Sequence, residues 1–315
     1  MNLAARHAAF GLLTIATTLA GCVSCPKTHV SMDQLVSEYN ANAARVPRLK
    51  ARAKIHVTLT DERGRSFGWG STSALAPPNG MLLLSKHDDP LGDKDFVLVG
   101  RESLAVDLFR VGSSAAEGKY YLWYHMSEYG KAWWGRLDLA GAPGIEQMPI
   151  DPNHLLSVLA ICAIPQEFSE LPTVLMRMSK DPCAYVLTYV DRQARTGRII
   201  ATHEIYFNWD DSGLRRPFMI KLLGPDSKHI MTARLSNYRR IDADSPEAQG
   251  PVMPTDIRID WPAKGNKVHL ALSEMSSADT WDVSFCRFSD ELPSGIGPDN
   301  IVQVDAALKT GVPIE

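Results

Sequence analysis

The stretch "ARAKIHVTLTDERG", residues 51–64, decides the fold class of this chain. As far as Thr60, apolar and polar residues alternate strictly, which is typical of a β-strand with one dry face and one wet face. The apolar positions are Ala51, Ala53, Ile55, Val57 and Leu59. Asp61 to Gly64 then supply residue types that favour a turn. The stretch therefore predicts a strand that leads into a hairpin.

Similar strand-like stretches follow at short intervals along the chain. Examples are "MLLLSK" at 81–86, "DFVLVGR" at 95–101, "KYYLWYHM" at 119–126 and "RIIATHEIYFNWD" at 198–210. Turn-forming pairs such as Asn79-Gly80 lie between them. Short strands with hairpin-sized gaps predict an antiparallel meander. We expect a sheet of this size to curl towards a barrel.

A helix is predicted ahead of the first strand. In "SMDQLVSEYNANAARV", residues 31–46, apolar residues recur at helical spacing, and Ser31 or Asp33 can cap the helix. Pro47 ends the pattern.

A second helix is predicted in the middle of the chain. "PIDPNHLLSVLAICAI", residues 149–164, begins with Asp151 as a cap and Pro152 at the first helical position. The residues that follow are apolar around nearly the whole circumference, and a helix of this kind is buried. We expect it to lie as a lid against the concave face of the curled sheet.

The N-terminus has the pattern of a secretory signal peptide. Arg6 precedes a stretch from Ala8 to Ala20 without a charged residue, which is shorter than the roughly 20 residues that span a membrane. The stretch ends on Leu19-Ala20-Gly21-Cys22. We therefore divide the chain into a signal peptide at 1–21, a tether at 22–30 and a single domain at 31–315.

Leu19-Ala20-Gly21-Cys22 resembles the lipobox of bacterial lipoproteins. That resemblance implies that Cys22 carries the lipid, including palmitate, and becomes the first residue of the mature protein. Several acyl chains together make a lasting membrane anchor. Val23 stands where an aspartate would favour retention in the inner membrane, so the resemblance implies the periplasmic face of the outer membrane.

Composition and motifs argue against several other classes of protein. The formal net charge is −3 with no basic cluster, so nucleic acid is not an expected partner. The sequence has no Gly-x-Ser-x-Gly, no phosphate-binding glycine-rich loop and no His-Glu-x-x-His. We therefore predict no catalytic residue, no metal site and no cofactor. Pairing among the remaining cysteines stays open, and these are Cys25, Cys162, Cys183 and Cys286.

The order of a lipobox, an N-terminal helix, a long meander and a central lid helix resembles the LolA/LolB-type lipoprotein carriers. "LVSEYNANAARVPRLKARAKIHV" followed by "GWGSTSALAPPNGMLLL" is similar to the opening helix and first hairpin of such proteins. The resemblance implies a mainly β fold of the α+β type, with a curved antiparallel sheet forming an unclosed barrel under a helical lid. It also implies a cavity that holds acyl chains.

The sequence hypothesis is a membrane-anchored periplasmic lipoprotein that binds or transfers lipid acyl chains or lipoproteins. A curled sheet under one short lid encloses more volume than the lid fills, and ligand sites are typically concave and apolar. The inward-facing positions define the predicted ligand-binding set. Its members are Ile55, Val57, Leu59, Phe67, Trp69, Leu104, Leu108, Leu122, Trp134, Leu155 and Leu159.

Two other functions remain open on the sequence. The first is a structural or assembly lipoprotein whose interior is filled by side chains and which binds another envelope protein. The second is a secreted hydrolase.

Overall fold

The computed structural model describes the chain from Val30 to Thr310 with gaps. The described residues are 30–60, 64, 66–70, 79–87, 93–103, 106–126, 129–142, 145, 148–165, 174–192, 199–208, 215–242, 250–277, 280–288, 292–293 and 295–310. Cys22 and the lipobox lie outside the described residues, as do Cys25 and Leu104.

Within the described residues, the fold is one large open sheet of 15 strands. Along the sheet the order is β15-β7-β6-β5-β4-β3-β1-β14-β13-β12-β11-β10-β9-β8, and β2 pairs with β1 beside this path. The strands are β1 (Arg48–Thr60), β2 (Ser66–Gly70), β3 (Gly80–Lys86), β4 (Lys94–Ser103), β5 (Val106–Ser114), β6 (Lys119–Met126), β7 (Tyr129–Arg136), β8 (Val174–Lys180), β9 (Cys183–Arg192), β10 (Ile199–Asn208), β11 (Pro217–Leu223), β12 (His229–Arg240), β13 (Val252–Trp261), β14 (Asn266–Ser276) and β15 (Ile301–Gln303).

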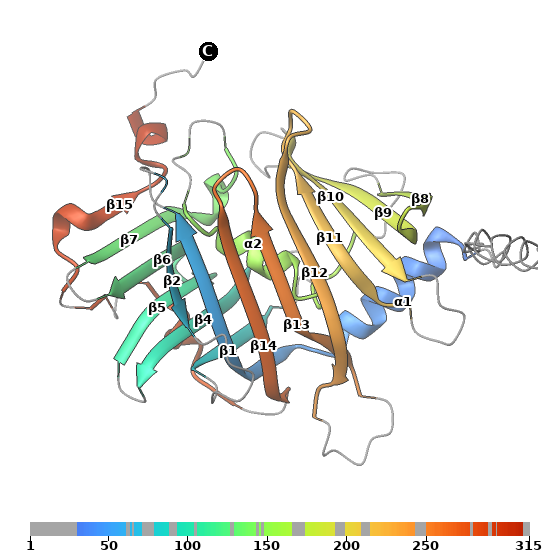
Figure 1. Cartoon of the computed structure of the whole chain (residues 1–315), viewed down its shortest axis with the longest axis horizontal. Coiled ribbons are helices and arrows are strands. Elements are labelled where there is room, and N and C mark those ends of the chain that lie inside the picture. The colour runs from blue at the N-terminus through green and yellow to red at the C-terminus, as the bar shows by residue number, and fades with distance from the viewer. Residues whose placement is uncertain are drawn as a thin grey trace, which may run out of the picture.

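The strand β1 joins two meanders. One runs through β3 to β7 and the other through β8 to β14, and β1 lies between β3 and β14. Figure 1 shows that the sheet is strongly twisted, so that β4 to β7 run across the direction of β12 and β13. The sequence predicts a purely antiparallel sheet. The structure differs at one edge, where β15 pairs with β7 in parallel.

The strict alternation read from residues 51–59 sets the two faces of β1. The side chains of Ala51, Ala53 and Ile55 are fully buried in the main core, while Arg52 is exposed. Burial of the odd-numbered positions fixes the register, because a shift by one residue would bring the polar set into the core.

The helix α1 (Met32–Ala44) packs its apolar face against the core. The hydroxyl of Ser31 caps it by accepting a hydrogen bond from the Gln34 backbone N–H at 3.1 Å. Asn42 ties α1 to β13, since its side-chain amide exchanges two hydrogen bonds with the backbone of Val252, at 2.8 and 2.9 Å.

The helix α2 (Pro152–Ser157) is shorter than the helix predicted over 149–164. Its start agrees with the prediction, because the Asp151 carboxylate accepts a hydrogen bond from the Asn153 N–H at 2.9 Å. Ala160, however, has a φ of +56°, which a right-handed helix does not contain. The apolar residues after Ser157 are therefore buried as irregular chain. The Asn40 side chain binds both backbone groups of Ile164, at 2.7 and 2.8 Å, which offsets the burial of that peptide.

A C-terminal segment, residues 280–288, covers the outer face of β3 to β5, and we call it the strap. Trp281, Phe285 and Cys286 pack there against Leu83 and Val97. The strap contains the 3₁₀ turn η2 (Val283–Cys286).

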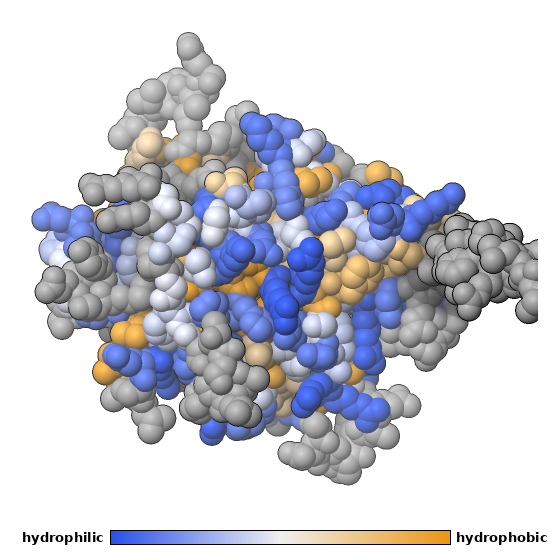
Figure 2. Space-filling model, in the orientation of Figure 1, coloured by the Kyte–Doolittle hydropathy of each residue, from blue (hydrophilic) through white to orange (hydrophobic). Residues whose placement is uncertain are grey.

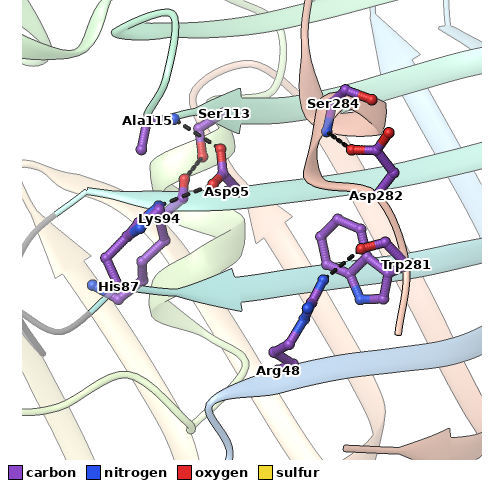
Figure 3. Close-up of polar contacts among 9 residues, drawn as sticks. All are labelled: Arg48, His87, Lys94, Asp95, Ser113, Ala115, Trp281, Asp282 and Ser284. Atoms are coloured by element: carbon purple, nitrogen blue, oxygen red, sulfur yellow. Dashed lines mark hydrogen bonds and ion pairs between the residues drawn. The ribbon is translucent and has the colours of Figure 1, made fainter. Parts of the chain in front are cut away.

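Polar contacts fix the strap to the sheet (Figure 3). Asp282 caps η2 by accepting a hydrogen bond from the Ser284 N–H at 2.9 Å. The Arg48 guanidinium donates to the Trp281 carbonyl at 2.5 Å and lies 5.1 Å from the centre of the Trp281 ring. Part of the sheet is therefore covered on both faces.

The outer face of the middle strands is mainly hydrophilic, and apolar side chains gather towards β10 and β11 (Figure 2). Within the described part of the chain, no helix has both the length and the apolar character needed to cross a membrane.

Candidate ligand cavity

A cavity of about 590 Å³ lies between the two meanders. Its wall is assembled from α1, α2 and the chain that follows α2, the facing ends of β4 and β5, the chain after β7, and β9 to β12. The lining residues are Tyr39, Asp93, Lys94, Ser113, Leu137, Ala140, Gly141, Asp151, Asn153, His154, Leu156, Ser157, Cys162, Ala163, Pro165, Tyr189, Val190, Asp191, Arg192, Ile200, Ala201, His203, Ile205, Leu222 and Ile230.

One wall of the cavity is aliphatic and comes from β10 to β12. Ala201 and Ile205 face inward by the alternation of β10. Ile200 also reaches the cavity, because the pairing of β10 with β9 passes from Ile199 to Ala201 and leaves Ile200 as the extra residue of a β-bulge. Leu222 and Ile230 complete this wall from β11 and β12.

The part of the cavity wall formed by β9, the middle of β10 and α2 is polar. His203 lies across from Tyr189 in the register, and the two rings are stacked with centroids 4.6 Å apart. The Nε2 atom of His203 hydrogen-bonds the Asp191 carboxylate. The His203 side chain is only 6% exposed, whereas Asp191 is 43% exposed. This arrangement holds a buried imidazole in a fixed orientation beside a partly hydrated carboxylate.

His154 on α2 is a neutral group in this polar region. Burial is the main cause that lowers the pKa of His154, and the nearby Asp151 carboxylate opposes the shift. The Trp261 indole N–H donates to Nδ1 of His154 at 3.4 Å. Because Nδ1 accepts, the single proton of the neutral ring is on Nε2.

Two tyrosines bring their rings to the same cavity. Burial raises the pKa of Tyr39 and of Tyr189 well above the usual value for a phenol, and the charge of Asp191 raises that of Tyr189 further. Both hydroxyls therefore keep their protons at any physiological pH.

The predicted ligand-binding residues are placed mostly in the packed core. None of the members whose side chains the structure describes lines this cavity. Those that are fully or nearly fully buried in the main core are Ile55, Val57, Leu59, Leu122, Leu155 and Leu159. Trp69 is half-buried and stacks on Phe109 with ring centroids 6.3 Å apart. The side chain of Phe67 and all of Leu104 lie outside the described residues.

Two positions differ from the inward orientation that the sequence predicted. Trp134 lies on the outer face, where its ring is 6.2 Å from that of Phe288, and Trp133 faces the core instead. Leu108 is the extra residue of a β-bulge, since Gly100 pairs with Phe109 and Arg101 with Asp107. Polarity alone misassigned Trp134, because both faces of β7 carry aromatic side chains.

The cysteines and possible metal ligands add no reactive centre. Cys162 lines the cavity as a thiol, Cys286 is a buried thiol under the strap, and Cys183 is disulfide-bonded. Among the described residues, no three or more His, Cys, Asp and Glu side chains are grouped so that they could hold a metal ion.

Comparisons with known proteins give structural similarities only. The sequence matches no protein-family model and no curated protein. The fold is similar to a DUF1329 family protein from Desulfovibrio piger, with a TM-score of 0.44, 11% identity, and coverage of 81% of this chain and 98% of that one. It is also similar to a LolA superfamily protein from Nitrosomonas europaea, with a TM-score of 0.43, 15% identity and coverage of 82% and 98%.

A third similar structure is a putative outer membrane lipoprotein-sorting protein domain from Vibrio parahaemolyticus, with a TM-score of 0.43, 10% identity and coverage of 83% and 94%. Each likeness is coarse.

Proposed function

We propose that this protein is a lipid-anchored carrier at the periplasmic face of the outer membrane, which accommodates acyl chains or the lipid part of a lipoprotein. The observation that carries the proposal is the cavity of about 590 Å³ with an aliphatic wall from β10 to β12. Small-molecule sites occupy roughly 300–1,000 Å³ and are mostly apolar.

Binding would come from burial of the acyl chain and would need no covalent chemistry. Transfer of apolar surface out of water contributes about 25 cal/mol per Å². The aliphatic residues Ile200, Ile205, Leu222 and Ile230 offer that surface. We assign ligand contact to these lining residues, and we assign the predicted set around Ile55 and Leu122 to the packed wall that gives the sheet its curvature.

The anchor is proposed at Cys22, where the thiol takes the diacylglyceryl group. Cells fed labelled palmitate are expected to label the wild-type protein, and the Cys22→Ser variant is expected to lose the label, because serine offers no thiolate. Cys25→Ser is the matched control and should stay labelled. Unchanged labelling of Cys22→Ser would refute the anchor and leave the cavity proposal standing.

A structural or assembly role with a filled interior is the second candidate, and the strap supports it. Residues 280–288 bury the outer face of β3 to β5, so that these three strands are packed on both faces. The lipid content of the purified protein separates the two functions, since a filled scaffold releases no lipid beyond its covalent anchor.

A further inference from the structure

The polar region of the cavity contains three hydrogen-bonding groups without protein partners. Tyr39 is only 6% exposed and lines the cavity, yet no hydrogen bond among the described residues uses its hydroxyl. The same holds for the Tyr189 hydroxyl and for Nε2 of His154. None of the three is among the polar atoms that are fully enclosed without a partner, so they are open to the cavity, where a ligand can supply the hydrogen-bond partner.

The three groups lie in one region. The Asp191 carboxylate raises the pKa of both Tyr189 and His154, so both groups lie near it. His203, whose ring stacks on that of Tyr189, lines the same cavity. All three groups therefore line one cavity, and we treat them as one binding region.

All three groups are uncharged donors. The two phenols retain their O–H, and neutral His154 presents Nε2–H because Trp261 occupies Nδ1. The carboxylates of Asp191 and Asp151 line the same cavity, and a carboxylate repels an anion.

Among the described lining residues, three carboxylates, those of Asp93, Asp151 and Asp191, outnumber two cations, those of Lys94 and Arg192. Lys94 and Arg192 line the cavity, but both already take part in contacts within the protein. Lys264 donates its ammonium to the carbonyl of Met148. A set of neutral donors next to carboxylates suits a neutral acceptor such as a carbonyl oxygen, and it disfavours a carboxylate or a phosphate.

We propose that the cavity selects acyl lipids with an uncharged headgroup, and that Tyr39, Tyr189 and His154 bind the ester or amide carbonyl of the ligand. The proposal rests on the proposed carrier function, because it requires that the acyl chain enter the same cavity. The expected ligand is an acyl ester or an acyl amide, and the anion of a free fatty acid is expected to bind more weakly.

Displacement of an apolar dye tests the proposal. N-phenyl-1-naphthylamine is uncharged and has no carbonyl, so its binding reports the apolar cavity alone. We expect methyl palmitate to displace it at a concentration at least tenfold lower than palmitate needs. Tyr39→Phe and Tyr189→Phe should each raise the concentration of methyl palmitate required by about three- to tenfold, the worth of one hydrogen bond, without changing dye affinity.

Tyr206→Phe is the matched control, because its hydroxyl donates to Glu204 at 2.8 Å outside the cavity. The headgroup proposal would be overturned if methyl palmitate and palmitate displaced the dye equally well, or if both tyrosine variants behaved like the wild type. Dye binding in these experiments would still support the carrier function. A wild-type protein that binds neither dye nor ester would overturn both.

Discussion

Ala201→Phe is expected to reduce binding of an acyl ligand at least tenfold, which corresponds to about 1.4 kcal/mol. Ala201 lies on β10 with its side chain in the cavity wall, and it is only 7% exposed. A phenyl ring at this position occupies the space along Ile205 and Leu222 that we assign to the chain. Titration with an apolar dye or with methyl palmitate measures the loss.

The control for this variant is Ala116→Phe in the exposed turn between β5 and β6, which is expected to bind like the wild type. Overpacking costs about 1–3 kcal/mol where no space exists, so the melting temperature of Ala201→Phe shows whether the ring has entered open space. A folded Ala201→Phe protein with unchanged affinity would exclude this cavity as the binding site.

Arg110→Ala is expected to lower the free energy of unfolding by about 3–5 kcal/mol. Arg110 is only 1% exposed and lies between the rings of Trp123 and Phe285, at 5.9 and 4.6 Å from their centres. Its guanidinium pairs with Asp107 at 3.1 Å and donates to the carbonyl of Phe285 at 3.4 Å. Removing it leaves a gap beneath the strap and a half-buried carboxylate with one fewer partner.

Urea denaturation with a common slope measures this loss. Arg136→Ala is the comparison, because Arg136 and Asp138 form an ion pair with side chains 45% and 48% exposed, and exposed pairs contribute about 0–1 kcal/mol. Equal free energies of unfolding for the two variants would show that Arg110 does not stabilise the packing of the strap on the sheet.

The central strand was predictable from the sequence because one of its faces is dry and the other wet. The alternation at Ala51, Ala53 and Ile55 gave both the element and the face, and the structure confirms both. The mainly β fold and the unclosed sheet were predictable in the same way. The parallel pairing of β15 with β7 was not, because three residues carry no directional pattern.

The sequence did not predict correctly which side chains face the core where both faces of a strand are covered. The sequence "AWWGR" places Trp133 and Trp134 side by side, and only the contact with Phe288 shows which one faces outward. That contact joins residues far apart in the chain, so no local pattern contains it. The end of α2 was also misjudged, since α2 ends at Ser157 and the positive φ of Ala160 interrupts the expected helix although the apolar sequence continues.

A cavity was expected from the sequence, but its lining residues were missed because its wall is assembled from many separate elements. One sequence signal for it did exist. In "ATHEIYF", His203 occupies the same parity as Ala201 and Ile205, so a histidine falls on the dry face of β10. A polar residue at such a position predicts either a partner in the core or a ligand, and the sequence alone does not show Asp191 beside it.

The claim that this fold is a carrier is tested most directly by the lipid that copurifies with it. The wild-type protein and Ala201→Phe are purified from membranes in the same detergent, extracted with organic solvent, and the released lipid is quantified by mass spectrometry per mole of protein. We predict near-stoichiometric release of a neutral acyl lipid from the wild type and its loss from Ala201→Phe. The absence of lipid from the wild type, or equal amounts from both proteins, would contradict the carrier function.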